Sequence, residues 1–167
     1  AVGDLTGDGK SDVLARDAKT HETGVYPGDG KGHVSTTPVA TTGKFAGLRS
    51  LVAGRDFNSD GKLDVIGRTL GGALQLFRGL GGGRFAFPVL LSKEWPYTGT
   101  IAVGDFNGDK LPDLMAISDG HTLYLFPGRG GGLSLGPKVE VKQSATKLLS
   151  LLAWGDLTGD DHADVMA

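Results

Sequence analysis

The stretch that decides the fold is a nine-residue loop that reads Asp-Phe-Asn-Ser-Asp-Gly-Lys-Leu-Asp, from Asp56 to Asp64. Oxygen-bearing side chains stand at its positions one, three, five and nine, and a glycine stands at position six. Calcium takes about 6 to 8 oxygen ligands, and a short loop with alternating carboxylates can wrap around it. Glycine permits the sharp turn because it tolerates a positive φ. The pattern predicts a calcium loop, in which the carbonyl of Lys62 at position seven is a further ligand by analogy with helix-loop-helix proteins.

The same pattern occurs four times along the chain. The first aspartates of the copies are Asp4, Asp56, Asp105 and Asp156, so the copies lie 52, 49 and 51 residues apart. A period near fifty residues indicates a repeat architecture. The predicted metal ligands, at positions one, three, five, seven and nine of each copy, are Asp4, Thr6, Asp8, Lys10 and Asp12; Asp56, Asn58, Asp60, Lys62 and Asp64; Asp105, Asn107, Asp109, Leu111 and Asp113; and Asp156, Thr158, Asp160, His162 and Asp164.

Three of the copies depart from the pattern. Thr6 and Thr158 place a neutral hydroxyl at position three, where the other copies have an amide oxygen. Lys110 and Asp161 replace the glycine at position six, where a side chain costs about 1 kcal/mol or more if φ is positive. The loop from Asp56 to Asp64 is therefore expected to bind calcium most tightly.

The acidic residues are concentrated in these loops. Twelve of the 16 aspartates occupy positions one, five and nine, and without them the formal net charge of -2 would be +10. Carboxylates this close repel one another unless a cation lies between them. The overall charge gives no reason to expect nucleic acid as a partner. The chain has no cysteine, which excludes disulfides and thiolate metal sites, and no apolar run long enough to span a membrane.

The segments between the loops predict short antiparallel strands. They are rich in Val, Ile, Leu and Phe and are separated by Gly and Pro. In the second repeat the expected strands are 51–56, 63–68, 73–77 and 85–91. A four-stranded unit of about 40 to 50 residues repeated in tandem is a propeller blade. The expected fold is an all-β propeller segment, with repeats at about 1–52, 53–101 and 102–152 and a partial repeat at 153–167.

The strand and loop together resemble a known repeat. The sequence Gly-Asp-Phe-Asn-x-Asp-x-x-x-Asp after an Ala-Val-Gly strand, as in Ala102 to Asp113, resembles the FG-GAP or VCBS repeat family of integrin α-subunit heads and many secreted bacterial proteins. The Leu-Tyr-Leu-Phe-Pro-Gly of Leu123 to Gly128 is similar to the bacterial branch. The resemblance covers essentially the whole chain. It implies a β-propeller with calcium bound between the first two strands of each blade, in a secreted or cell-surface protein.

The resemblance also implies a non-catalytic module that binds a ligand. Glycan or cell-wall material is the first expectation, and a protein partner in the integrin manner is the alternative. A domain of a secreted hydrolase is the least favoured reading, because the chain has no Gly-x-Ser-x-Gly, no His-Glu-x-x-His and no cysteine. Calcium is expected to be structural, with a dissociation constant on the order of 10⁻⁴ to 10⁻³ M. No membrane insertion is expected.

Two aromatic residues between the second and third repeats are the candidate ligand-binding residues. Sugars stack on the faces of Trp and Tyr, which points to Trp95 and Tyr97. The preferred alternative is that Trp95 packs between adjacent blades, as Phe45 would do in the preceding segment. The glycine-rich turn Gly79 to Gly83 is not expected to bind phosphate, because a strand follows it rather than the N-terminus of a helix.

Three repeats and a remnant are fewer blades than a propeller needs. Natural propellers close with about 4 to 8 blades, and an open sheet edge exposes unpaired backbone groups. The chain is therefore expected to be part of a larger propeller, or to join a second chain in a ring of six or seven blades. It begins at Ala1, directly in a predicted strand, so we expect a processed or excised piece of a longer protein.

Overall fold

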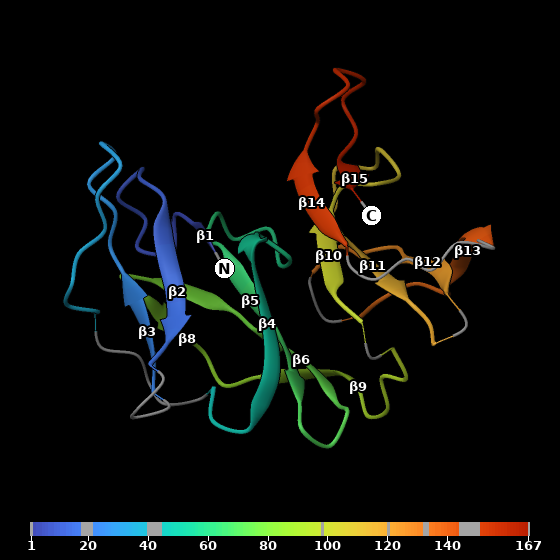
Figure 1. The fold of residues 1–167 in the computed structure, drawn as a ribbon, viewed down its shortest axis with the longest axis horizontal. Helices are drawn as coiled ribbons and strands as arrows, with labels where there is room; N and C mark the ends of the chain where they lie inside the picture. The colour runs from blue at the N-terminus through green and yellow to red at the C-terminus, as the bar shows by residue number, and fades with distance from the viewer. Residues whose placement is uncertain are drawn as a thin grey trace.

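The computed structural model describes residues 2–17, 22–39, 45–97, 99–119, 121–131, 134–143 and 151–166. This part of the chain is all-β, in agreement with the prediction, and its sheets follow one another along the sequence (Figure 1). No helix capable of crossing a membrane is found in it.

Four antiparallel sheets carry the fold, and each begins with the strand that leads into one of the aspartate loops. The first sheet has the order β1 (Val2–Gly3), β2 (Asp12–Arg16) and β3 (Thr23–Tyr26). The second has the order β4 (Leu48–Arg55), β5 (Asp64–Thr69), β6 (Leu74–Phe77) and β9 (Val89–Ser92). The third has the order β10 (Ile101–Gly104), β11 (Asp113–Ile117), β12 (Thr122–Phe126) and β13 (Val139–Gln143). The fourth pairs β14 (Leu152–Gly155) with β15 (Asp164–Met166).

The last strand of the second sheet differs from the prediction. A single strand was expected at 85–91, but the structure divides this segment at Pro88. Before the proline, β8 (Arg84–Phe85) pairs with β7 (Gly79–Gly81) in a small hairpin. After it, β9 pairs with β6. Proline has no backbone N–H to donate to a ladder, which explains why β9 begins one residue beyond it.

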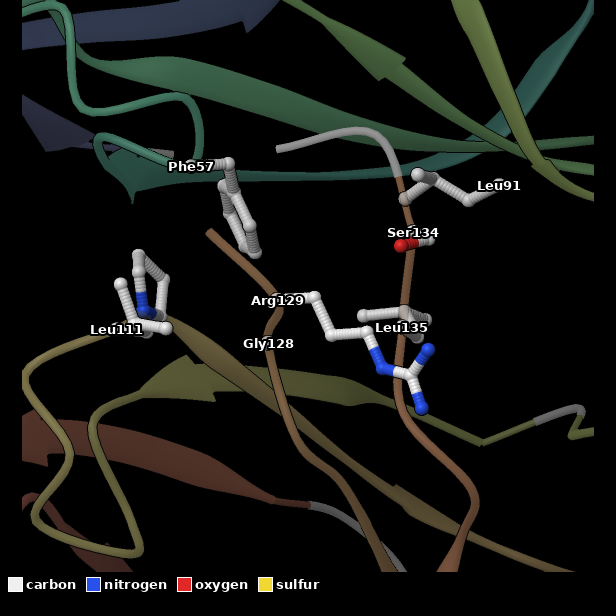
Figure 2. A pocket seen from close by; sticks show the side chains of 8 residues that line it. Phe57, Leu91, Leu111, Gly128, Arg129, Ser134 and Leu135 are labelled. Carbon is white, nitrogen blue, oxygen red and sulfur yellow. The ribbon is translucent and has the colours of Figure 1, made fainter. Parts of the chain in front are cut away.

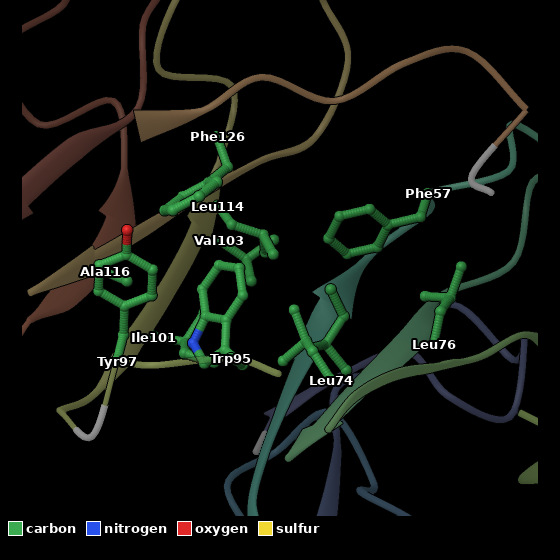
Figure 3. Close-up of a cluster of buried hydrophobic side chains, with 11 residues drawn as sticks. Phe57, Leu74, Leu76, Trp95, Tyr97, Ile101, Val103, Leu114, Ala116 and Phe126 are labelled. Carbon is green, nitrogen blue, oxygen red and sulfur yellow. The ribbon is translucent and has the colours of Figure 1, made fainter. Parts of the chain in front are cut away.

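The core lies between adjacent sheets. Between the first and second, Phe45 is buried, and its ring centroid lies 4.8 Å from Phe77 and 5.2 Å from Phe85. Between the second and third, Trp95 is buried, and its ring centroid lies 4.6 Å from Phe126 (Figure 3). Phe45 and Trp95 stand fifty residues apart in the sequence and fill the same place in successive repeats. Face-to-face burial of this kind makes each sheet one blade of a partial β-propeller.

An arginine also joins the first blade to the second. Arg16, at the end of β2, donates from Nη1 to the carbonyl oxygen of Leu48 at 3.0 Å and from Nη2 to that of Phe45 at 2.7 Å. These charge-assisted hydrogen bonds hold the segment that leads into β4. Sequence reasoning did not assign this role to Arg16, although Arg68 occupies the corresponding position of the second repeat.

Candidate metal centre

The four aspartate loops all lie in the place that the resemblance implied. Each connects the first two strands of its sheet: β1 to β2, β4 to β5, β10 to β11 and β14 to β15. In these four pairs the ladder ends at the loop with the position-nine aspartate in the last register pair. The predicted ligand residues of each copy are therefore gathered in one turn, at one end of each blade.

The position-one aspartate organises the turn by accepting backbone N–H groups. In the second loop, Asp56 Oδ1 accepts from Asp60 at 3.1 Å, and Asp56 Oδ2 accepts from Gly61 at 2.7 Å. Asp4, Asp105 and Asp156 make the equivalent bonds to the position-six N–H in their own loops. This repeated pattern is the one expected of an aspartate that shapes its own turn.

The position-three and position-five residues face each other across the turn. Asn58 donates from Nδ2 to Asp60 Oδ2 at 3.0 Å, and Asn107 donates to Asp109 in the same way at 3.0 Å. Asp60 Oδ1 accepts the N–H of Lys62 at 2.9 Å. In the first loop, Thr6 stands at position three, and its buried Oγ1 has no hydrogen-bond partner among the described residues.

The position-nine aspartate is buried and links its loop to a second turn of the same blade, a role that sequence reasoning missed. Asp64 is fully buried; its Oδ2 accepts the N–H of Phe57 at 2.9 Å, and its Oδ1 accepts the N–H of Gly79 at 2.7 Å. Asp12 and Asp113 are also fully buried and join their loops to the turn after the third strand in the same way. These residues were assigned only as metal ligands, whereas each also anchors the blade.

A sequence signal for this junction was present. In three repeats the residue that donates its N–H to the position-nine aspartate is a glycine: Gly28, Gly79 and Gly128. A Cβ at these glycines would collide with the carbonyl oxygens of Ser11, Leu63 and Pro112 respectively. Only glycine therefore lets the backbone approach closely enough for its N–H to reach the buried carboxylate.

The backbone at position six has the positive φ at which a side chain was expected to be costly. Lys110 and Asp161 both have a φ of 66°, in the left-handed region that glycine occupies in the other two loops. Position four is left-handed as well, which the sequence pattern did not predict: Ser59 has a φ of 60°. Glycine stands at position four in the other three copies, and that preference was the available signal.

Burial and nearby charge both shift the pKa values of the loop carboxylates. Burial raises the pKa of Asp64; hydrogen bonds from Gly79 and Phe57 oppose this shift, and the charges of Asp56 and Asp60 add to it. Burial likewise raises the pKa of Asp113 in the third loop, with added repulsion from Asp109 and Asp105. In the exposed fourth loop, the N–H of Asp161 makes the largest contribution to lowering the pKa of Asp156.

These shifts predict a pH dependence for the metal-free protein. A carboxyl whose pKa rises on folding stabilises the fold fully below its unfolded pKa, near 3.8, and this contribution is lost as the pH rises through the folded pKa. In chelator, carbon-detected NMR should show Asp64 and Asp113 titrating above 3.8 and Asp156 titrating below it. Titration of Asp64 and Asp113 at or below the value of Asp156 would contradict the burial argument.

The donor chemistry of the loops fits a hard cation. Carboxylate, amide, hydroxyl and backbone oxygens are the ligands that calcium takes. Among the described residues, however, no three Asp, Glu, His or Cys side chains converge into a group that could hold a metal. In each loop the carboxylates point to backbone N–H groups instead. A carboxylate oxygen that accepts one N–H keeps a second lone pair, so these bonds do not exclude a cation.

The two candidate ligand-binding aromatics are buried rather than exposed. Trp95 and Tyr97 are each 5% exposed and pack in the core between the second and third blades (Figure 3). Their ring centroids lie 4.9 Å apart, and both contact Phe126. A sugar needs an open aromatic face, so the interpretation of these residues as a surface platform is wrong. The alternative, that Trp95 packs between blades, describes the structure.

A small cavity lies beside the second and third loops. Figure 2 shows Phe57 from the second loop, Leu111 from the third and Leu135 from the third blade around it. Its volume of about 10 Å³ suits roughly one water molecule and no larger ligand.

Comparisons with known proteins agree with this architecture. A family profile described as FG-GAP-like repeat matches residues 4–66, 56–116 and 105–167. No curated protein matches the chain. Among solved structures, the Photorhabdus luminescens Tc holotoxin pore is similar, with a TM-score of 0.65 and 19% identity. The match covers 98% of this chain and 8% of that one, and it supports the fold alone. Three family matches in register with the aspartate loops show that the chain belongs to the FG-GAP-like repeat family.

Proposed function

We propose that the chain is a non-catalytic, calcium-stabilised β-propeller module that binds a macromolecular ligand in a secreted or cell-surface protein. The observation that carries the calcium proposal is the mutual repulsion of the loop carboxylates. Burial is the largest cause that raises the pKa of Asp64, and the charges of Asp56 and Asp60 add to the shift. A cation placed among these carboxylates would therefore relieve their repulsion.

In the second loop, calcium would be held by the carboxylates of Asp56, Asp60 and Asp64, the amide oxygen of Asn58 and the carbonyl of Lys62. The bound ion would supply positive charge to the turn. Because Asp64 also ties the loop to Gly79, order in the turn would be transmitted to the next hairpin of the same blade. The ion's role would therefore be structural.

Calcium is expected to raise the melting temperature of the protein, and excess EDTA to lower it. A ligand that binds only the folded state at ten to a hundred times its dissociation constant stabilises by about 1.4 to 2.7 kcal/mol per site. Differential scanning calorimetry with 10 mM calcium against 10 mM EDTA measures the shift. Magnesium at the same concentration should give a smaller one, because magnesium gives up its water reluctantly.

A matched pair of variants tests where calcium acts. Asp60→Asn removes a charge inside the second loop and should reduce the calcium-induced shift. Asp29→Asn removes the same charge from a hairpin outside the loops and should leave the shift unchanged. Identical melts in calcium and EDTA for the unmodified protein would refute the proposal.

The ligand class is proposed from what the blades expose. Apolar side chains stand on the outer edge strands: Leu90 on β9 and Val139 and Val141 on β13 are each about half exposed. With Trp95 and Tyr97 buried, these side chains favour a protein partner over a glycan. A glycan array in calcium separates the two classes. A specific sugar signal would favour glycan recognition, and a blank array with binding to an extracellular protein would favour adhesion.

A further inference from the structure

The first strands of the second and third blades, β4 and β10, border a cavity of about 410 Å³. Arg49 and Ser50 line it from β4, and Arg68 lines it from β5. Gly99 and Thr100 line it from the two positions just before β10. Small-molecule sites commonly have volumes of about 300 to 1,000 Å³, so the cavity has the size of a binding site.

The cavity carries positive charge. Its described lining holds two arginines and two hydroxyls and no acidic residue. Arg68 is only 9% exposed, whereas Arg49 is exposed, and no ion pair engages Arg49 in the described part of the chain. Burial weakens the screening of a charge by water, and a concave wall of low dielectric concentrates its field. The cavity should therefore attract anions.

The aspartate loops are too far away to neutralise the positive charge of the cavity. Arg49 stands near the start of β4, and Asp56 follows the end of that strand, seven residues later. At about 3.3 Å per residue the two are separated by roughly 23 Å. The Debye length at physiological ionic strength is only about 8 Å. The two ends of the blade are therefore electrostatically independent.

Arg49 is not part of the repeat scaffold, whereas Arg68 occupies the position of Arg16, which bonds to the segment between the first two blades. The residues at the positions of Arg49 and Arg68 in the third repeat are Gly99 and Ile117. The third blade forms its four-stranded sheet without either arginine. A local departure from a repeat pattern that the fold does not require is where a specific function is expected.

We propose that this cavity binds a small oxyanion: a phosphate, a sulfate or a carboxylate. A guanidinium matches the paired oxygens of such groups with two parallel N–H donors. The buried Arg68 presents its charge from a fixed position, the exposed Arg49 reaches the anion from the rim, and the hydroxyls of Ser50 and Thr100 supply further donors. The site is independent of calcium.

Amide NMR of the labelled chain in EDTA tests the site. Sodium phosphate, sulfate and acetate are titrated at constant ionic strength against sodium chloride. We expect saturable shifts in the signals of Ser50, Gly99 and Thr100, and the relative affinities distinguish a phosphoryl or sulfate group from a carboxylate. The absence of saturable shifts with all three anions would overturn the proposal.

Two arginine variants separate the site from general charge. Arg49→Ala should weaken binding by about tenfold or more, because it removes a charge-assisted donor pair from an exposed side chain that the fold does not need. Arg84→Ala removes an equal charge from an exposed position on β8 and should leave the affinity unchanged. Equal affinities for the two variants would overturn the proposal, and circular dichroism confirms that both are folded.

Discussion

Asp64→Ala is expected to destabilise the protein by about 2 to 6 kcal/mol even when no calcium is present. The substitution removes the carboxylate that accepts two N–H groups, those of Phe57 and Gly79, and leaves both groups without this acceptor. Each such group costs about 1 to 3 kcal/mol. Because whole domains are stable by about 5 to 15 kcal/mol, the loss is a large part of the total. Urea unfolding in EDTA measures it.

Asp60→Ala is the matched control for this prediction. Asp60 belongs to the same loop and carries the same charge, but it is exposed, and its partners Asn58 and Lys62 can bond to water instead. In EDTA this variant should lose no more than about 1 kcal/mol, while its response to calcium is reduced. If both variants lost equal stability in EDTA, the position-nine aspartate would be an ordinary loop residue rather than a structural junction.

The contrast between these two aspartates shows what the sequence could predict. The spacing of the loops predicted the all-β blades, because a nine-residue turn repeated about every fifty residues leaves room for four short strands. Spacing alone treated Asp56, Asp60 and Asp64 as equivalent ligands. Their difference depends on Gly79, fifteen residues further along, which brings a backbone N–H to Asp64. Contacts of this kind, between separate elements, depend on how the blade packs. The spacing of the repeats does not predict them.

Trp95 shows the same limit, because its sequence left two readings open, sugar binding and the preferred packing between blades. The sugar-binding reading rested only on the residue types of Trp95 and Tyr97 in the segment between two repeats. The packing reading rested on the alignment with Phe45, which fills the preceding interface between blades. Position within the repeat was therefore a better guide to burial than local composition, because each interface must be filled by the segment that joins two blades.

Trp95→Ala is accordingly expected to destabilise the protein by about 3 to 5 kcal/mol, the usual cost of emptying a large aromatic site. The indole contacts Tyr97 and Phe126 across the interface of the second and third blades, so its loss should separate these blades. The measurement is urea unfolding followed by circular dichroism, since the substitution also removes a fluorophore.

Trp95→Phe provides the matched variant. It keeps an aromatic ring against Phe126 and removes the buried indole Nε1, which has no hydrogen-bond partner in the part of the chain that the structure describes. Loss of an unsatisfied donor offsets part of the lost packing, so the cost should stay below about 1.5 kcal/mol. If Trp95→Ala instead kept full stability and abolished binding to a glycan, the residue would act at the surface. Core packing between the blades would then have to rest on the other members of the cluster, such as Leu74, Leu114 and Phe126.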